Sequence, residues 1–367
     1  MDAKVIAIIT GERGRREIVR PLAAVGVACF VLDWELLRAR SRRPYLRFIR
    51  AVWKLVRARR PTVVFTDMNS AFLAVILLVA RLSGARVVLR LRGDPFAENR
   101  DQLRFHWTQR EWPQLARALV ARLLDRPLFA GVDRFIPVSH WIVRRLGIAG
   151  RAEVVRVPVS PGDFPPRPPA GPPPLRLLAV TNFNYPQKVA ALGRFLGQHG
   201  EFLRTNGISV TVAGAGIAWK TFRARHASYA TFPGFVDDVA RLYATHDIFV
   251  HFSDLDAFPY VVLEAQAAGL PVLVNNDCGM LEQVEHSETG LIVDLNDRAQ
   301  VERTILDLKH APELRAKLGA AAAQPSRKNT RTVKSARSFS ARLRRFELAD
   351  RLPGFPRFSA TSNPSDP

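Results

Sequence analysis

Cysteines and long apolar runs are both scarce in this sequence of 367 residues. Its two cysteines, Cys29 and Cys278, lie far apart and outside any Cys-x-x-Cys or His cluster, which argues against a disulfide framework and against a zinc site. The longest apolar run, residues 71–80, is too short to span a bilayer. The first predicted strand starts at residue 5, which leaves no room for a secretory signal. We therefore expect a cytoplasmic protein.

Acidic residues are scarce relative to basic ones. The chain has 54 Lys and Arg against 33 Asp and Glu, a formal net charge of +21. Ten of the cations lie between Arg38 and Arg60 with no acid among them. The apolar residues that recur there at helical spacing are Tyr45, Phe48, Ile49, Val52, Trp53 and Val56. Such a basic amphipathic helix could lie on the anionic inner face of the plasma membrane. Its apolar side could equally pack on a sheet and leave the arginines in solvent.

Predicted strands alternate with helical segments along the whole chain, which is typical of parallel α/β domains. The first half has predicted strands at 5–10, 27–32, 62–67, 86–91, 134–139 and 153–159. The second half has predicted strands at 176–182, 209–214, 230–234, 248–253, 270–276 and 291–294. We predict two Rossmann-like domains that face each other across a cleft.

A proline-rich segment divides the two halves. Residues 158–174 are so rich in proline that we predict an extended linker. The N-terminal Rossmann-like domain would then cover 1–157 and the C-terminal one 175–325. Residues 326–352 form a second basic segment that ends in a predicted helix, and 353–367, rich in Pro and Ser, are expected to be disordered.

Two acidic residues lie eight positions apart across a predicted strand-to-helix junction. Asp256 follows the strand 248–253 in a loop, and Glu264 falls two turns into the helix predicted at 258–269. In an open parallel sheet, ligands bind in the crevice outside the carboxyl ends of the strands. Backbone N–H groups and the dipole at the helix start suit an anionic diphosphate without a metal. The residues at that start are Phe258, Pro259 and Tyr260.

The segment around these acids resembles the retaining glycosyltransferases of family 4, which have the two-domain GT-B fold. The family pattern is Glu, seven residues, Glu, then a small-residue helix end, Gly-x-Pro-Val, and Gly-x-x-Glu before an exposed Gly. The matching positions here are Asp256, Glu264, Gly269, Pro271, Val272, Gly279, Glu282 and Gly290. The first acid is Asp rather than Glu. The resemblance implies that Asp256 orients the donor sugar, that Glu264 binds the ribose, and that a final helix crosses back to the first domain.

The resemblance also assigns donor-binding residues elsewhere in the second half. Lys188 matches the lysine of an Arg, four residues, Lys pair, but Phe183 stands in the arginine position beside Asn182. Gly214 and Gly216 match a Gly-x-Gly turn that approaches the nucleotide. Phe235 and Val236 match residues that pack near the base.

The first half is expected to receive the acceptor. Asp94 and Arg92 follow a predicted strand, where the family often places a residue that contacts the transferred sugar. The alternative for Asp94 is a cap of the next helix. Gly11, in a predicted short loop after the first strand, would open toward the acceptor.

The resemblance implies a metal-independent glycosyltransferase with no cofactor beyond its nucleotide-sugar co-substrate, acting on a lipid-linked or saccharide acceptor in polysaccharide or glycolipid biosynthesis. A sugar-nucleotide epimerase or hydrolase, or a binder without catalysis, would share the fold. The basic charge is also typical of nucleic-acid-binding proteins, but the sequence has no recognisable RNA or DNA module, so we do not expect a nucleic-acid partner.

Overall fold

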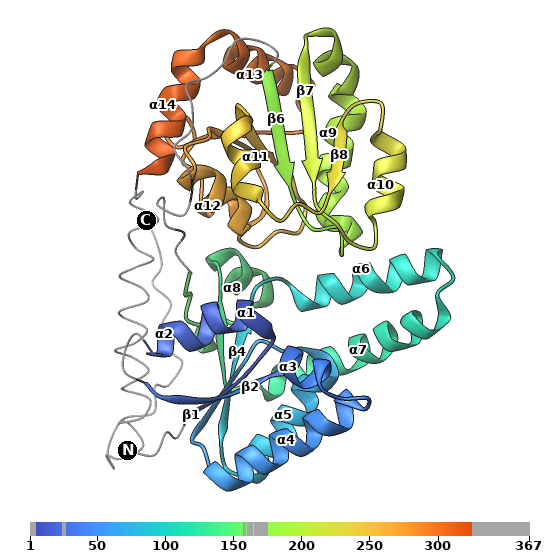
Figure 1. Ribbon diagram of the computed structural model, residues 1–367, viewed down its shortest axis with the longest axis vertical. Coiled ribbons are helices and arrows are strands. Elements are labelled where there is room, and N and C mark those ends of the chain that lie inside the picture. Colours follow the sequence, from blue (N-terminus) through green and yellow to red (C-terminus); the bar gives the residue numbers. More distant parts are fainter. Residues whose placement is uncertain (1–4, 24–26, 157–158, 160–163, 165–174, 325–367) are drawn as a thin grey trace, which may run out of the picture.

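The computed structural model describes residues 5–23, 27–156, 159, 164 and 175–324. Two α/β domains lie one above the other along the longest axis of the molecule (Figure 1). Each contains one parallel sheet, as the alternating sequence pattern predicted. The predicted linker at 158–174 lies almost entirely outside the described residues, and the predicted crossing helix and tail lie wholly outside them.

The N-terminal sheet has five parallel strands in the order β2-β1-β3-β4-β5. All five residues of β1 are buried because helices cover both faces of the sheet, which is why the strand is an unbroken apolar run. The bounds are β1 Val5–Ile9, β2 Cys29–Asp33, β3 Val63–Thr66, β4 Arg86–Leu91 and β5 Arg134–Pro137.

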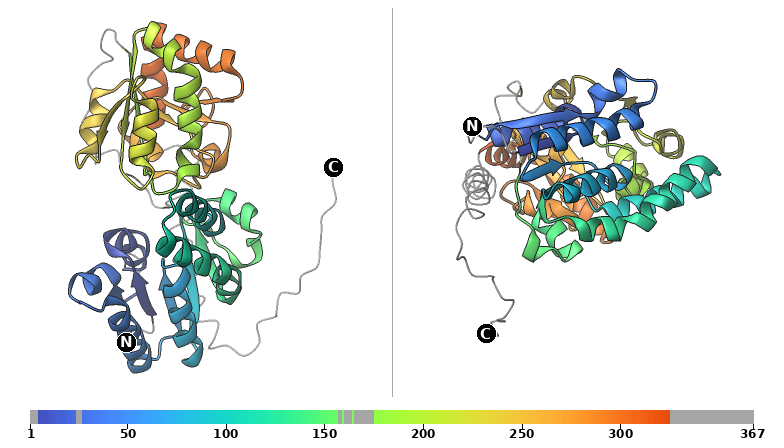
Figure 2. Two further views of the ribbon diagram at one scale, coloured as in Figure 1. Left: turned by 90° about the vertical axis from the view of Figure 1, so that its right-hand side faces the viewer. Right: turned by 90° about the horizontal axis from the view of Figure 1, so that it is seen from below.

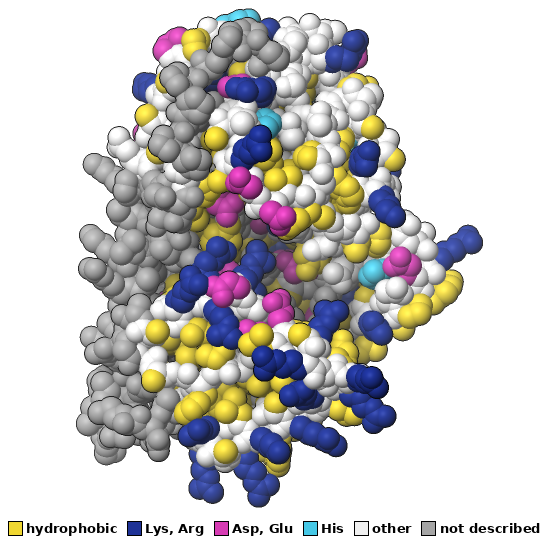
Figure 3. Space-filling model, viewed as in Figure 1, with side chains coloured by type: hydrophobic (Ala, Val, Ile, Leu, Met, Phe, Trp, Pro, Cys, Tyr) yellow, Lys and Arg dark blue, Asp and Glu magenta, His cyan; other side chains and the backbone are white. Residues whose placement is uncertain are grey.

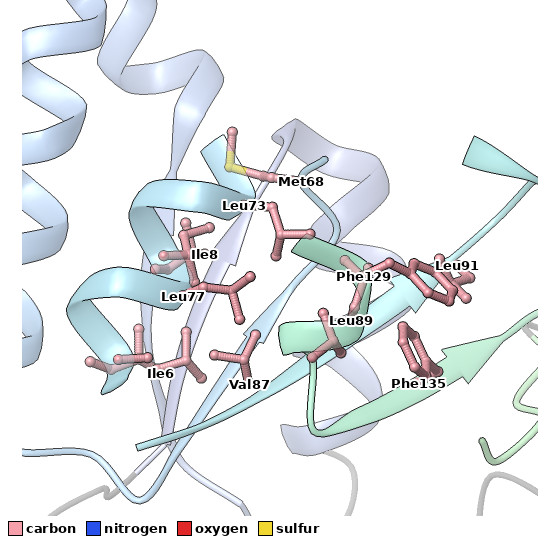
Figure 4. Close-up of a cluster of buried hydrophobic side chains, with 14 of the residues drawn as sticks. Ile6, Ile8, Met68, Leu73, Leu77, Val87, Leu89, Leu91, Phe129 and Phe135 are labelled. Atoms are coloured by element: carbon pink, nitrogen blue, oxygen red, sulfur yellow. The ribbon is translucent and has the colours of Figure 1, made fainter. Parts of the chain in front are cut away.

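The helices of this domain form two layers. One face of the sheet packs on α4, α5 and α7 through the cluster shown in Figure 4, and the other face packs on the segment that follows β1. The bounds are α1 Gly11–Gly14, a π-helix at Arg15–Val19, α2 Arg20–Ala23, α3 Trp34–Ala39, α4 Pro44–Arg59, α5 Ser70–Leu82, α6 Pro95–Thr108, α7 Trp112–Gly131, α8 His140–Leu146 and a 3₁₀ turn at Ala149–Arg151.

The α6–α7 pair forms a helical hairpin. Seen from below, it extends to one side beyond the rest of the N-terminal domain (Figure 2). The base of α6 lies near the C-terminal domain, because α6 contacts α9 there. Asn99 of α6 donates a hydrogen bond of 2.8 Å to Asp125 of α7, which ties the two helices together.

The C-terminal sheet has six parallel strands in the order β11-β10-β9-β6-β7-β8. Its strands are β6 Leu175–Val180, β7 Ile208–Ala213, β8 Thr231–Gly234, β9 Ile248–His251, β10 Val272–Asn275 and β11 Leu291–Val293. Its helices are α9 Pro186–Thr205, α10 Trp219–His226, α11 Val239–Thr245, α12 Tyr260–Ala267, a 3₁₀ turn at Cys278–Glu282, α13 Arg298–His310 and α14 Pro312–Ala323. The sheet is buried between these helices. The carboxyl ends of its strands are directed toward the N-terminal domain (Figure 1).

Three local predictions were wrong. Residues 153–156 form no strand. An isolated bridge joins the preceding residue, Ala152, to β5, and Glu153 and Val155 donate backbone hydrogen bonds to β5. Gly11 begins a helix rather than a loop, and its N–H donates to the Asp33 carboxylate at 3.0 Å. The helix predicted from residue 258 begins at Tyr260, because Pro259 is its N-cap in extended conformation.

The predicted basic helix is α4, and its predicted apolar stripe is divided between the core and the surface. Phe48, Val52 and Val56 are buried in the core of the N-terminal domain, whereas Tyr45, Ile49 and Trp53 are 62%, 43% and 41% exposed. The packing alternative therefore holds for the three buried residues. No helix within the described residues is long and apolar enough to cross a membrane.

Candidate functional site

The candidate site lies where the carboxyl ends of the two sheets face each other. Figure 3 shows acidic and basic side chains gathered around the hollow between the two domains. In the C-terminal domain, the residues following β6, β7 and β9 contribute the predicted donor-binding groups. Parallel sheets place ligands at this edge because backbone groups and loop side chains converge there.

Lys188 and Asp256 form an ion pair at the centre of this edge. The Lys188 Nζ lies 2.8 Å from the Asp256 Oδ2, and the two side chains are 18% and 9% exposed. His251, at the end of β9, places its Nε2 3.2 Å from the same carboxylate oxygen. Two residues that three strands and two helices separate in the sequence are thus in direct contact.

The surroundings of Asp256 favour its charged form. Burial by itself would raise the pKa of Asp256, but the Lys188 ammonium and the hydrogen bond from His251 hold that pKa well below its ordinary value. Asp256 is therefore an anion and Lys188 has a partner at neutral pH. A diphosphate that approached Lys188 would compete with Asp256 for the ammonium.

A short network holds Lys188 beside the Asp256 loop. The Ser253 hydroxyl donates to the Lys188 carbonyl at 2.8 Å, which ties the end of β9 to the first turn of α9. The Ser253 N–H donates in turn to the Asn275 side chain at 2.9 Å. The Gly279 N–H donates to the Asp256 carbonyl at 3.0 Å. A Cβ at Gly279 would overlap the carbonyl oxygen of Ala257, which explains why this motif position requires glycine.

Glu264 lies deeper along α12, as predicted. Its Oε2 accepts a hydrogen bond of 3.0 Å from the Tyr243 hydroxyl, and Tyr243 is fully buried. Burial, together with the Glu264 charge, raises the pKa of Tyr243, so the tyrosine stays a donor to the carboxylate. This bond fixes the orientation of the Glu264 carboxylate on the helix.

The start of α12 is packed against the N-terminal domain. Phe258 is buried in the same apolar cluster as the core of that domain, and Tyr260 packs against it. The Arg16 guanidinium lies 5.3 Å from the centre of the Tyr260 ring, and the Arg156 guanidinium lies 4.9 Å from that of Phe258. Pro259, between them in sequence, is buried. The predicted anion-binding turn is thus part of the contact between domains.

The two glycines after β7 shape the neighbouring loop. Gly214 and Gly216 have φ angles of +145° and +147°, a region that favours glycine. A Cβ at Gly214 would overlap the backbone carbonyl of Thr181, and one at Gly216 would overlap the backbone at Phe183 and Asn184. The β7 loop therefore packs directly on the loop after β6.

The residues beside these glycines have different environments. The Phe183 side chain is fully buried against Trp219 and Phe222, so it takes no part in the cleft. Asn182 has a buried side-chain oxygen that accepts no hydrogen bond from the described residues. Phe235 is 73% exposed and Val236 is half-buried, so both side chains reach the surface after β8.

The N-terminal side of the cleft carries a network of paired charges. Arg92 donates to Glu17 at 2.8 Å and to Asp67 at 2.7 Å, and Arg90 donates to Glu17 at 3.1 Å. Burial would raise the pKa of Glu17, but Arg90 and Arg92 lower it. The Nε and Nη2 groups of Arg92 thus each donate to a carboxylate, of Glu17 and of Asp67. Arg92 therefore holds these two acids in place and is not a free cation.

Asp94 is the helix cap that the sequence offered as its alternative. Its Oδ1 accepts from the N–H groups of Phe96 and Ala97, each at 3.0 Å, and its Oδ2 accepts from Arg145 at 2.6 Å. Both oxygens are thus occupied within the N-terminal domain. A role for Asp94 toward the transferred sugar stays a prediction.

Glu98 is a residue at the cleft that sequence reasoning missed. It lies one turn after Asp94 on α6, and the Tyr185 hydroxyl, just before α9, hydrogen-bonds to it. Burial raises the pKa of Glu98 to about 7, although nearby Lys188 acts in the opposite direction. Three positions further on the same helix face, Asp101 accepts from the Gln187 N–H at 2.8 Å. Acids of the first domain therefore face the start of α9, and only the tertiary fold brings them there.

Glu282, the last acid of the motif, joins the two domains. Its carboxylate accepts from the backbone N–H groups of His140 and Trp141, at 3.0 and 2.6 Å, at the start of α8 in the first domain. Arg156 also pairs with it. Sequence reasoning assigned Glu282 to a motif but not to this contact, which no local pattern could have indicated.

No cluster of three or more His, Cys, Asp or Glu side chains that could hold a metal ion occurs within the described ranges. The cations beside the predicted donor site are the side chain of Lys188 and arginines contributed by the N-terminal domain, including Arg16 and Arg156. Any diphosphate in this cleft would meet these groups and the start of α12.

Residues 204–324, most of the C-terminal domain, match the family described as glycosyl transferases group 1. A putative glycosyltransferase, ORF31, of a virus isolated in Victoria, Australia, is 25% identical over 217 residues, which cover 58% of this chain and 65% of that protein. A GDP-mannose-dependent alpha-(1-6)-phosphatidylinositol monomannoside mannosyltransferase of Mycobacterium tuberculosis is 34% identical over 105 residues, covering 25% of this chain and 27% of its own length. The chain thus spans less than two thirds of either relative.

The fold as a whole resembles solved glycosyltransferase structures. Anabaena HepE, solved in complex with UDP and glucose, superposes with a TM-score of 0.65 over 93% of this chain and 99% of its own, at 15% sequence identity. This likeness confirms the predicted fold, two Rossmann-like domains in the GT-B arrangement. At this identity it bears on the fold alone.

Proposed function

We propose that this chain is a retaining glycosyltransferase that moves a sugar from a nucleotide-sugar donor to a lipid-linked or saccharide acceptor. The observation that carries the proposal is the contact of Lys188 with Asp256 at the carboxyl edge of the C-terminal sheet, 2.8 Å apart. It is supported by the match of residues 204–324 to glycosyl transferases group 1.

In this proposal, the donor diphosphate takes the place of Asp256 as the partner of Lys188. Negative charge accumulates on the diphosphate as its bond to the sugar breaks, so fixed donors aimed at it stabilise the transition state. Lys188 and the N–H groups at the start of α12 supply such donors without a metal. Asp256, released from the ammonium, then accepts hydrogen bonds from sugar hydroxyls.

The remaining donor contacts follow from the same geometry. Glu264, held by Tyr243 at 3.0 Å, presents its carboxylate to the ribose hydroxyls. Gly214 and Gly216 let the loop after β7 pack directly on the loop after β6, and in this proposal the backbone of these two loops lines the nucleotide site. Phe235, 73% exposed, is available to cover the base. The acceptor enters from the N-terminal side, near Arg92 and Asp94.

The test is product analysis with a mixed pool of nucleotide sugars and a membrane lipid fraction, in the presence and absence of EDTA. We expect a glycosylated product whose anomeric configuration, read by NMR, is that of the donor, in equal yield with EDTA. Free sugar without an acceptor product would indicate a hydrolase, and a changed sugar still attached to its nucleotide would indicate an epimerase. Inversion of the anomeric centre would refute the retaining mechanism.

A thermal-shift panel separates binding from catalysis. We expect nucleotide sugars to raise the melting temperature and oligonucleotides to leave it unchanged once salt screens the +21 charge. Asp256→Asn, which keeps the size of the side chain, should still bind nucleotide diphosphate but transfer sugar poorly. Stabilisation by oligonucleotides at high salt would favour a nucleic-acid partner instead.

A further inference from the structure

Helix α7 of the protruding hairpin exposes an apolar stripe. Of its large hydrophobic residues, Trp112, Leu119, Val120 and Leu123 are 61%, 49%, 53% and 68% exposed. At about 100° per residue, these positions and their neighbours fall within roughly 140° of the helix circumference. The stripe, called the α7 stripe below, consists of Trp112, Ala116, Leu119, Val120, Leu123 and Leu124.

The opposite face of α7 accounts for its packing. Ala118, Asp125 and Phe129 are the buried residues of this 20-residue helix. Asp125 accepts from Asn99 of α6 at 2.8 Å, and Phe129 stacks on Phe135 of β5 with ring centres 4.4 Å apart. The α7 stripe therefore takes no part in the packing of α7 on α6 and the sheet. Figure 3 shows hydrophobic side chains along the protruding hairpin.

Positive charge borders the stripe on both sides. By the same helical spacing, Arg117 lies just beyond one edge, and Arg122 and Arg126 lie beyond the other. Asp125 is the sole acid in α7, and it is buried on the packed face. The exposed side of the helix is thus apolar along its middle and cationic along its margins.

The apolar surface continues beyond α7 at both ends. At the hairpin tip, Trp107 and Trp112 are 64% and 61% exposed and pack edge to face with ring centres 6.1 Å apart. At the base, α5 packs beside α7 and exposes Leu78 and Leu82, at 63% and 67%. A groove lined by Leu78, Leu82 and Pro127 joins the two helices.

We propose that the α7 stripe is a docking surface for an anionic lipid bilayer. An amphipathic helix with apolar residues in its centre and arginines at its margins lies in the plane of the interface, where the apolar side chains enter the acyl boundary and the cations meet lipid headgroups. Exposed tryptophans at the tip suit the same region, because the indole ring prefers the membrane interface. The arginines beside the α7 stripe attract anionic lipid and repel a second copy of this basic chain. The charge therefore favours a bilayer over a dimer as the partner of the stripe.

This placement differs from the α4 placement that the sequence offered. In α4, Phe48, Val52 and Val56 are buried in the core, whereas Tyr45, Ile49 and Trp53 are exposed. In α7, the stripe as a whole faces solvent. The inference is independent of the proposed reaction. If the acceptor is lipid-linked, docking on the bilayer would bring the enzyme to it.

The experiment is co-sedimentation of the full chain with phosphatidylcholine vesicles that contain phosphatidylglycerol, at low salt and at about 0.5 M salt, where exposed charges are largely screened. The wild-type chain should keep measurable binding at high salt, because apolar insertion resists screening. Leu119→Gln/Leu123→Gln should weaken that salt-resistant binding by roughly tenfold or more, a change of about 1.4 kcal/mol.

The matched control is Leu46→Gln/Ile49→Gln in α4, where the two side chains are 51% and 43% exposed. This variant should bind vesicles like the wild type, and both variants should unfold at the wild-type temperature. An α7 variant with undiminished high-salt binding would overturn the proposal. So would an equal loss in both variants, or a dimer in light scattering that the α7 substitutions dissociate.

The two proposals can fail separately. The melting-temperature shift with nucleotide sugar reports the donor site and does not involve α7, so it should be the same in the α7 variant and the wild type. Loss of vesicle binding with an intact donor response supports the docking surface. Donor binding without any salt-resistant vesicle binding in the wild type would overturn the docking surface alone.

Discussion

Replacing Lys188 by Ala removes one partner of a buried ion pair and leaves Asp256 with His251. Breaking such a pair typically costs about 3 to 5 kcal/mol, because the remaining charge stays buried without compensation. The pair is 18% and 9% exposed, so we expect a loss of about 3 kcal/mol in the free energy of unfolding near neutral pH. Turnover should fall by roughly two to three orders of magnitude, as for the loss of one transition-state donor.

The pH dependence of this loss has a definite sign. In the wild-type chain the folded pKa of Asp256 is depressed, so its contribution to stability is present above the ordinary pKa and is lost as pH falls through the folded pKa. Without Lys188, burial is the largest remaining influence on that pKa and acts to raise it, opposed by His251 alone, so we expect the pKa of Asp256 in the variant to lie above its wild-type value. Relative to the wild-type chain, the variant should then lose stability as pH rises, so its deficit should be smaller at about pH 5 than at about pH 7.5.

Urea unfolding at the two pH values measures both effects. Lys188→Ala/Asp256→Asn should recover most of the lost stability without recovering turnover, which separates folding from catalysis. Arg194→Ala is the matched control. The side chains of Arg194 and its partner Asp254 are 49% and 24% exposed, so the free energy of unfolding should decrease by less than about 1 kcal/mol. If Lys188→Ala costs no more than Arg194→Ala, the reasoning about the buried pair is wrong. Near-normal turnover would refute the role of Lys188.

Three further predictions concern the supports of the cleft. Gly279→Ala should lower the free energy of unfolding by about 2 kcal/mol or more and lower turnover, because the new Cβ meets a backbone carbonyl. Gly197→Ala, in an exposed position of α9, should raise the free energy of unfolding by up to about 1 kcal/mol. Urea unfolding measures both changes, and changes of the same sign in the two variants would contradict the prediction. Glu98 has a raised pKa of about 7, so its contribution to stability is lost as the proton dissociates with rising pH. In Glu98→Gln, the free energy of unfolding should therefore decrease less between about pH 5 and 7 than in the wild-type chain. An equal decrease in both proteins would argue against the raised pKa. Glu282→Ala removes the acceptor at the start of α8 and should increase the radius of gyration in small-angle scattering by loosening the two domains, while an unchanged radius would show that other contacts suffice.

The predicted strands and the motif were recognisable in the sequence because their signals are local. Apolar runs such as β1, bounded by turns, identify buried parallel strands whatever their neighbours. Gly214 and Gly216 were likewise recognisable, since a turn that requires their backbone angles selects glycine at those positions. Errors of a few residues arose at ends of elements, as at Pro259 and Gly11, where capping contacts decide the boundary.

The contacts of the site depended on packing between distant segments. Asp256 and Lys188 could each be singled out, but their distance of 2.8 Å follows from the order of β6 and β9 in the sheet. Glu98 carried no local signal, because its environment comes from α9 of the other domain.

The sequence alone determined the two-domain α/β architecture and the residue types at the carboxyl edge of the second sheet, because hydrophobic period and turn chemistry act over a few residues. Only the tertiary structure decided which charges pair and which apolar faces are buried. The helices α4 and α7 both carry apolar stripes among arginines, yet α4 places Phe48, Val52 and Val56 in the core, whereas the α7 stripe faces solvent. Burial depends on the surface that each helix meets, and that surface is made by residues far away along the chain.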